Sequence, residues 1–275
     1  MQQAAEGARE GAGRRTVTMS AATYEVAWSH AGLGDMPIVV YVPPKGFEEW
    51  ERAAVVRAAW EELERLGLAR FGELTGEFAD MLGLLSHARR EVDARLALDR
   101  VGVPGGEVRA VAAATGEEGV LAVVKGDELA LRWIFGTGLA REIVDLLPEQ
   151  QPGPGTSVSL PRAQVEQAAR RAGSSLYGFA DELVELGIPG EQARHMVRTM
   201  EGTFRRGQFG AAVRDREGRR HPAGRAVAFH DTKAGRYLMV DRQTSDGQIW
   251  TTVTPATSTL LAEHVQSLLD GIRIG

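Results

Sequence analysis

The feature that most constrains the fold is a change in hydrophobic period that occurs twice along the 275-residue chain. In residues 47–67, Ala53, Val56, Trp60 and Leu63 share one face at helical spacing, which indicates an amphipathic helix. Further on, apolar residues alternate with charged or small ones, which is the period of a half-buried strand. Helical spacing returns near residue 161, and extended segments follow it again. We therefore expect one order of elements to occur twice.

The first half is expected to contain an extended segment, helices, four strands and a closing helix. The extended segment is 36–44 ("MPIVVYVPP"), and "KGDE" at 125–128 predicts a tight hairpin turn. The stripe of the second helix is Leu74, Phe78, Met81 and Leu85, and that of the closing helix is Leu139, Ile143 and Leu146. The predicted strands are "REVDARLALDR", with Val92, Ala94, Leu96 and Leu98 on one face, then Glu107–Ala114, Val120–Lys125 and Glu128–Ile134.

The second half is expected to repeat this order after a short strand at Ser157–Leu160. The predicted helices are Pro161–Ala172, Leu176–Gly187 and Gly190–Met200. The predicted strands are Thr203–Arg214, Arg225–Asp231, Arg236–Asp241 and Gln248–Thr254. A last helix carries the stripe Leu261, Val265, Leu268 and Ile272. For that helix, Thr254 is the expected N-cap and Pro255 the expected first residue.

These elements predict an α+β (α/β) fold of two quasi-symmetric subdomains, each an antiparallel β-meander with flanking helices. The repeat is one of pattern, because residue identity between the halves is slight. The expected boundaries are a disordered leader at 1–22, an N-terminal subdomain at 23–150, a linker at 151–155 and a C-terminal subdomain at 156–275. Ordered structure is expected to begin near Tyr24.

Composition excludes several classes of protein. The chain has no apolar run of 18 residues that would span a membrane, and its N-terminus lacks the apolar region of a secretory signal. It has no cysteine, which excludes disulfides, thiolate catalysis and Cys-based zinc sites. The net charge of −5 argues against a chain devoted to nucleic acid. A cytoplasmic location is expected.

The sequence contains none of the catalytic or cofactor-binding templates that we tested. The stretch "QPGPGTSVSLP" (151–161) could suggest a phosphate-binding loop, but it has no lysine, and Pro154 lacks a backbone donor. It is interpreted as the linker between the halves. The six histidines form no HExxH zinc motif, and "FHDTK", which contains His230 and Lys233, lies at a strand-to-turn boundary. We expect no enzyme, no cofactor and no metal.

One segment has a strong local charge. From Glu201 to Arg225 the net charge is +4, from seven arginines against Glu201, Asp215 and Glu217. The arginines are Arg205, Arg206, Arg214, Arg216, Arg219, Arg220 and Arg225. Such a segment could bind nucleic-acid phosphates, although an acidic protein partner or a solvated hairpin loop fits it as well. Nucleic-acid binding is therefore the alternative hypothesis.

Five stretches, in this order and spacing, resemble the EspG family of cytosolic chaperones associated with ESX (type VII) secretion in actinobacteria. They are "REVDARLAL", "GEEGVLAVVKGDELALRWI", "LLPEQQPGPGTSVSLP", "RRGQFGAAVRD" and "GRYLMVDRQTSDGQIWTTVTPAT". The resemblance covers about Tyr24 to Ile272. The charged leader before Tyr24 is a departure from the family.

The resemblance implies a non-enzymatic chaperone that binds the helical tip of PE–PPE-type substrates and keeps them soluble for export, with no membrane insertion. It also makes the secretion ATPase complex a candidate partner. In the family the binding surface draws on the central sheet and the C-terminal helical region, here Leu176–Met200 and Thr203–Val213. The candidate partner-binding residues are Leu183, Leu186, Met196, Met200, Phe204, Arg205, Arg206, Gln208, Phe209 and Ala212. On the strand from Thr203, the face that starts with Phe204 and Arg206 has little bulk, and Gln208→Trp is expected to block docking.

Overall fold

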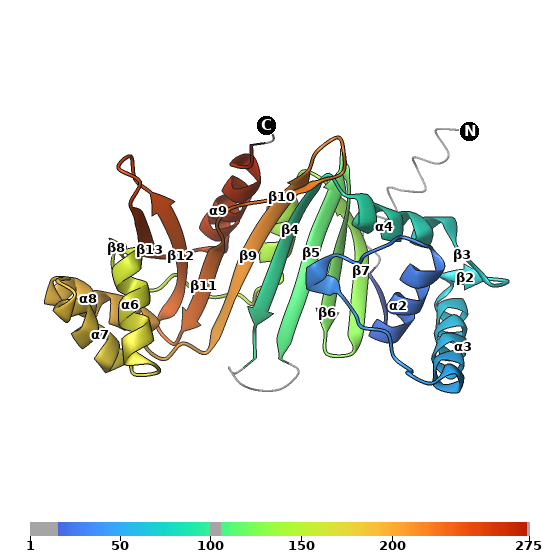
Figure 1. The fold of residues 1–275 in the computed structure, drawn as a ribbon, viewed down its shortest axis with the longest axis horizontal. Helices are drawn as coiled ribbons and strands as arrows, with labels where there is room; N and C mark the ends of the chain where they lie inside the picture. Colours follow the sequence, from blue (N-terminus) through green and yellow to red (C-terminus); the bar gives the residue numbers. More distant parts are fainter. Residues whose placement is uncertain (1–15, 100–105, 274–275) are drawn as a thin grey trace.

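The fold is a mixed α+β structure built on one large antiparallel sheet (Figure 1). The computed structural model describes residues 16–99 and 106–273. The strand order is β1-β7-β6-β5-β4-β9-β11-β12-β13-β8, and β10 pairs with β9 beside β11. The strands of this sheet are β1 (Val17–Ser20), β4 (Arg90–Ala97), β5 (Glu107–Thr115), β6 (Glu118–Lys125), β7 (Glu128–Phe135), β8 (Val158–Pro161), β9 (Arg205–Arg214), β10 (Arg220–Pro222), β11 (Val227–Thr232), β12 (Gly235–Gln243) and β13 (Ile249–Pro255).

Helices lie on both faces of the sheet, and a small hairpin of β2 (Ala69–Arg70) and β3 (Glu73–Leu74) stands apart from it. The helices are α2 (Ala21–His30), the 3-10 helix η1 (Ile38–Val40), α3 (Glu49–Leu66), α4 (Gly76–His87), α5 (Leu139–Val144), α6 (Arg162–Ala172), α7 (Leu176–Glu185), α8 (Gly190–Met200) and α9 (Ser258–Asp270). The strands β4 to β7 and most of the helices lie within a few residues of the predicted bounds.

Three apolar clusters hold these layers together. On one face, α5 and α9 pack over the sheet from β5 to β12. On the opposite face, α2, α3 and α4 cover β5 to β7 with residues such as Tyr24 and Phe78. On that same face, α6, α7 and α8 cover β8 and β13 at the other end. The middle of this second face, over β4, β9 and β11, is left without a covering helix (Figure 1).

Ordered structure begins earlier than expected. Strand β1 pairs with β7 from Val17 to Ser20, and Met19 is buried in the core beneath α2. The Ser20 side chain caps α2 by accepting from the Thr23 backbone N–H. The predicted leader at 1–22 is therefore wrong over 17–22, because a four-residue edge strand was too short to recognise, and its first part, 1–15, lies outside the described residues.

Other local predictions were also wrong. Within 36–44, Ile38–Val40 forms the 3-10 helix η1, because Pro37 starts a turn there instead of a strand. Ala53 of α3 is exposed, since the helix contacts the core through Ala59 and Leu63. The N-cap of α9 is Thr257, whose hydroxyl accepts from the Leu260 N–H, because β13 continues through the expected cap.

The segment that joins the halves is fastened to β12. The Arg236 backbone accepts from Gly153 N–H and donates to the Gln151 carbonyl, and the Tyr237 hydroxyl donates to the Pro154 carbonyl at 3.0 Å. A Cβ at Gly153 would lie 2.1 Å from the Tyr237 ring, so only glycine fits. The linker is therefore a fixed strap along the sheet.

Candidate functional site

The uncovered middle of the sheet forms a groove made of two adjoining hollows. The larger has a volume of about 850 Å³ and lies toward α7 and α8, and the smaller has about 480 Å³ and lies toward β10. Both are lined by Gln208, Ala228 and Met239. We call the two together the sheet groove. It is an open concavity on the face of the sheet that helices leave uncovered.

The floor of the sheet groove is a row of side chains across four strands. Cross-strand pairing places Arg95 of β4 beside Gln208 of β9, Gln208 beside Ala228 of β11, and Ala228 beside Met239 of β12. Directly paired residues point to the same face of a sheet. The neighbouring position on β9 is Gly210, where a Cβ would lie 2.9 Å from an Asp93 carboxylate oxygen. The floor is therefore low on the Ala228 side of Gln208, and the Asp93 carboxylate lies beside Gly210.

One wall of the groove is apolar. Leu176 at the start of α7 and Met200 at the end of α8 both line it. His230 of β11 fixes this wall, since its ring Nε2–H donates to the Thr199 carbonyl at 2.8 Å and the ring stacks on Tyr237. Burial lowers the pKa of His230. The neutral imidazole thus joins α8 to the sheet.

The other end of the groove is charged. Arg220 of β10 binds the Glu91 carboxylate of β4, and its second nitrogen lies 3.7 Å from Asp93. Arg162 of α6 lies 2.9 Å from Asp241 of β12. Burial, and then the charge of Glu91, raises the pKa of Asp93. Ion pairs thus border this end of the groove. A partner that binds there would contact paired charges held in place by the chain.

The predicted partner-binding residues divide into three groups. Met200, Arg206 and Gln208 line the sheet groove. Four others were wrong as surface residues, because they are buried: Leu183 and Met196 in the cluster of α6, α7 and α8, Phe209 against Phe229 beneath the sheet, and Ala212. Ala212 is on the open face, but its cross-strand neighbour Glu91 is held there by Arg220.

The remaining three candidates are partly buried. Leu186 packs against the cluster of α6, α7 and α8. The Arg205 guanidinium lies 4.9 Å from the centre of the Phe204 ring, and its Nε donates to the Leu98 carbonyl at 2.9 Å. None of the three is among the residues that line the groove, and their part in binding stays a prediction.

The basic segment is partly neutralised within the chain. Arg219 and His221 both bind the Asp215 carboxylate, at 2.8 Å each, and the His221 hydrogen bond holds the pKa of Asp215 well below its usual range. Arg220 is bound by Glu91, and Arg214 donates to the Gly218 carbonyl at 3.4 Å. Part of the segment is strand β10, where a solvated loop was one expectation. This pairing removes part of the free charge that nucleic-acid binding would need.

The "FHDTK" stretch is structural. Arg236 donates to both oxygens of Asp231, at 2.7 and 3.0 Å, and to the Pro148 carbonyl. Both side chains of this ion pair are fully buried. Over residues 16–99 and 106–273, no cluster of three or more histidine or carboxylate side chains is placed to hold a metal ion. No helix in these ranges is long and apolar enough to cross a membrane.

Sequence reasoning missed Leu176, Ala228 and Met239 as groove residues. The alternation of β12, with Leu238 and Val240 in the core, was a signal that Met239 faces the other way. The sequence alone does not give the strand register that aligns Met239 with Gln208.

Comparisons with known proteins agree with this architecture. A model of the EspG family matches residues 20–267. The ESX-3 secretion-associated protein EspG3 of Mycolicibacterium smegmatis is 27% identical over 263 residues, which cover 92% of this chain and 87% of that protein. A solved structure of the Mycobacterium tuberculosis type VII secretion system chaperone EspG5, in complex with a PE25-PPE41 dimer, is similar with a TM-score of 0.73 at 16% identity. That likeness covers 95% of this chain and 98% of the other, and it shows a shared fold.

Proposed function

The chain belongs to the EspG family, and we propose that it is a non-enzymatic chaperone of type VII (ESX) secretion. Its substrate is a PE–PPE-type heterodimer, whose helical tip binds in the sheet groove and is kept soluble there until export. The solved relative in complex with a PE25-PPE41 dimer supports this class of partner. Because the substrate has to be held before it is exported, the chaperone acts in the cytoplasm.

The observation that carries this proposal is the bare middle of an otherwise covered sheet. The strands β4, β9, β11 and β12 are adjacent, and at about 4.8 Å spacing they span roughly 14 Å. A helix with its side chains is about 10–12 Å wide. The groove floor therefore has the width of a helical tip.

The groove also has the chemistry of a reversible protein interface. Leu176, Met200 and Met239 offer apolar contact at one end, and methionine adapts to irregular surfaces. Arg206 at the rim could bind carbonyl or carboxylate groups of the tip. Apolar anchors would set the affinity and the charged rim the specificity.

Two quasi-symmetric subdomains remain part of the proposal. The strand order supports it, because β1-β7-β6-β5-β4 runs from one edge of the sheet to the centre as β8-β13-β12-β11-β9 does from the other. We assign 17–150 to the first, 151–155 to the linker and 156–275 to the second. Under this assignment the groove crosses the β4–β9 seam and lies mostly over the strands of the second subdomain.

The test is binding of a purified PE–PPE pair from the source organism to wild-type protein and to Gln208→Trp. The indole would fill the lowest part of the groove, so we expect at least a tenfold loss of affinity by calorimetry. The matched control is Gln243→Trp, an exposed glutamine on β12 outside the groove, which should bind as wild type does. Both variants should melt within about 2 °C of wild type. Normal binding by folded Gln208→Trp would exclude this surface.

A further inference from the structure

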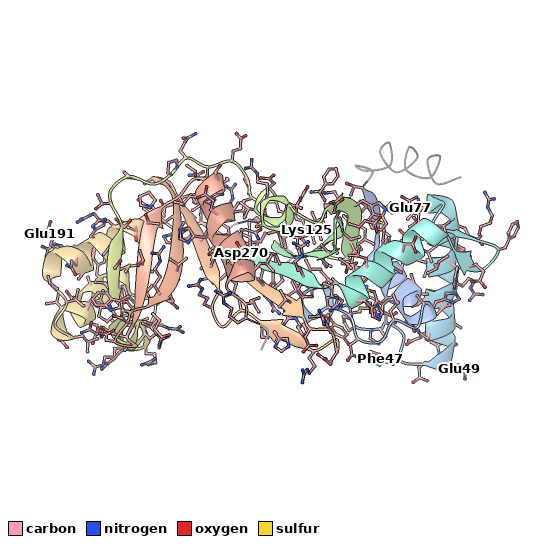
Figure 2. The ribbon with its side chains drawn as sticks, turned by 90° about the horizontal axis from the view of Figure 1, so that it is seen from above. Phe47, Glu49, Glu77, Lys125, Glu191 and Asp270 are labelled. Carbon is pink, nitrogen blue, oxygen red and sulfur yellow. The ribbon has the colours of Figure 1, made fainter. Side chains whose placement is uncertain are left out.

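Two aromatic side chains are displayed to solvent at the start of α3. Phe47 is 100% exposed and Trp50 is 72% exposed. They lie at the opposite end of the molecule from α8, as the labels Phe47 and Glu191 in Figure 2 show. Large exposed aromatics that lie close together mark interaction sites, and aromatic residues dominate protein interfaces. We call Phe47 and Trp50, with Glu48 and Glu49 between them, the aromatic turn.

The aromatic turn is held in one conformation. Gly46 has a φ of +86°, and a Cβ there would lie 2.7 Å from the Arg52 backbone nitrogen. The Glu51 carboxylate accepts from the backbone N–H groups of Phe47 and Glu48, at 3.1 and 3.3 Å. Arg52 donates to the Lys45 carbonyl and binds buried Glu25 at 2.6 Å. A fixed backbone that presents two aromatic side chains loses little entropy when a partner binds.

The charges around the turn indicate what kind of partner fits. Glu48 and Glu49 are exposed, whereas the nearby cations are occupied, Lys45 by Asp127 at 2.7 Å and Arg52 by Glu25. The surface around the aromatics is therefore acidic. It would be repelled by anionic lipid, and a second copy would bring like charges together. A protein with an apolar cleft and a basic rim is complementary to it.

We propose that the aromatic turn docks a second protein, with an apolar cleft edged by lysine or arginine, while the sheet groove holds the substrate. This inference rests on the proposed chaperone function for the loaded state. The groove is walled by α7 and α8, and the turn lies at the far end of the molecule, so both partners can be bound together. A docking site of this kind would let the export apparatus select loaded chaperone.

The first experiment uses the double variant Phe47→Ser with Trp50→Ser in the native bacterium. We expect export of the PE–PPE pair to fall at least tenfold, while the purified variant binds that pair within twofold of wild type. The matched control is Phe135→Ser, which removes a phenylalanine that is 77% exposed elsewhere and should leave export normal. Phe47→Leu with Trp50→Phe should retain most of the export. Normal export by the serine variant, or a parallel loss of substrate binding, would overturn the proposal.

The second experiment does not depend on the substrate. A photo-crosslinking benzoylphenylalanine at position 47 should give one discrete protein adduct in cells, and the same group at position 135 should not. Glu48→Lys with Glu49→Lys should abolish that adduct, because the partner's rim is basic. The absence of an adduct at position 47 would overturn the proposal. Failure of the proposed chaperone function would instead show as wild-type protein that binds no PE–PPE pair.

Two further measurements test whether the aromatic turn binds lipid or a second copy of the chain instead. Flotation with vesicles of 70% phosphatidylcholine and 30% phosphatidylglycerol should leave the wild-type protein unbound. Light scattering after size exclusion should give the same mass for wild type and for the serine variant. Vesicle binding that needs Phe47 and Trp50, or a dimer that needs them, would assign the turn to lipid or to a second copy and overturn the proposal.

Discussion

The strands β5 and β9 lie two apart in the same sheet, yet one is covered on both faces and the other on one. In β5, the residues from Ala110 to Ala114 are all buried, because α5 lies on one side and α2 and α4 on the other. In β9, Phe209 and Ala211 are buried, while Arg206 and Gln208 are exposed. A continuous apolar run therefore marks a strand between two layers, and alternation marks the strand that is free to bind a partner.

The largest expected effect comes from placing one negative charge on β5 and, for comparison, one on β9. Val111→Asp would bury a carboxylate between β5 and α4, with no partner, so we expect a loss of about 4 kcal/mol or more in the free energy of unfolding, or no folded protein at all. Gln208→Asp puts the same group on the open face and should change that free energy by less than about 1 kcal/mol. Urea denaturation measures both. Equal losses would mean that the middle of the sheet is covered in solution.

A smaller effect is expected at the buried ion pair of Arg236 and Asp231 beneath the sheet. Arg236→Met leaves buried Asp231 with only the more distant Arg205, 3.8 Å away, and releases the Pro148 carbonyl, which should cost about 3–5 kcal/mol. On the open face, Arg206→Met should cost less than about 0.5 kcal/mol. Thermal and urea unfolding compare the two. If Arg206→Met were the more costly change, the assignment of faces on β9 and β12 would be reversed.

The smallest expected effect is on the pH dependence of stability, and it tests whether His230 is buried where α8 meets the open face of the sheet. Because burial lowers the pKa of His230 below its unfolded value of about 6.5, the folded chain binds fewer protons than the unfolded chain just below that pH. Stability is therefore fully present above about pH 6.5 and falls as the pH drops toward the lowered pKa. His230→Gln should weaken this fall in melts between pH 7.5 and pH 5.5. An unchanged profile would show that the α8 wall does not bury His230.

Sequence alone specified the strands of the first meander well, because alternation in β4 and the Gly126 turn are local signals. It could not specify which strands meet. The row from Arg95 to Met239 depends on the pairing of Arg95 with Gln208, which are more than a hundred positions apart in the sequence. Ala212 was placed on the open face by alternation alone, and only the contact of Arg220 with Glu91 explains its burial. The hydrophobic period of a strand thus predicts which face of the sheet each residue is on. Strand pairing and side-chain contacts then decide which residues of that face are accessible.

The seam between β4 and β9 has a consequence for how the chain is made. Residues 90–97 pair with residues 206–213, so a ribosome at roughly 5–20 residues per second needs on the order of ten seconds to supply the second strand after the first. During that interval β4 presents an unpaired edge of backbone N–H and C=O groups. Strand β4 therefore cannot complete its pairing until the second half has been synthesised. A chain that ends before β9 keeps this unpaired edge, and strands of other nascent chains can pair with it.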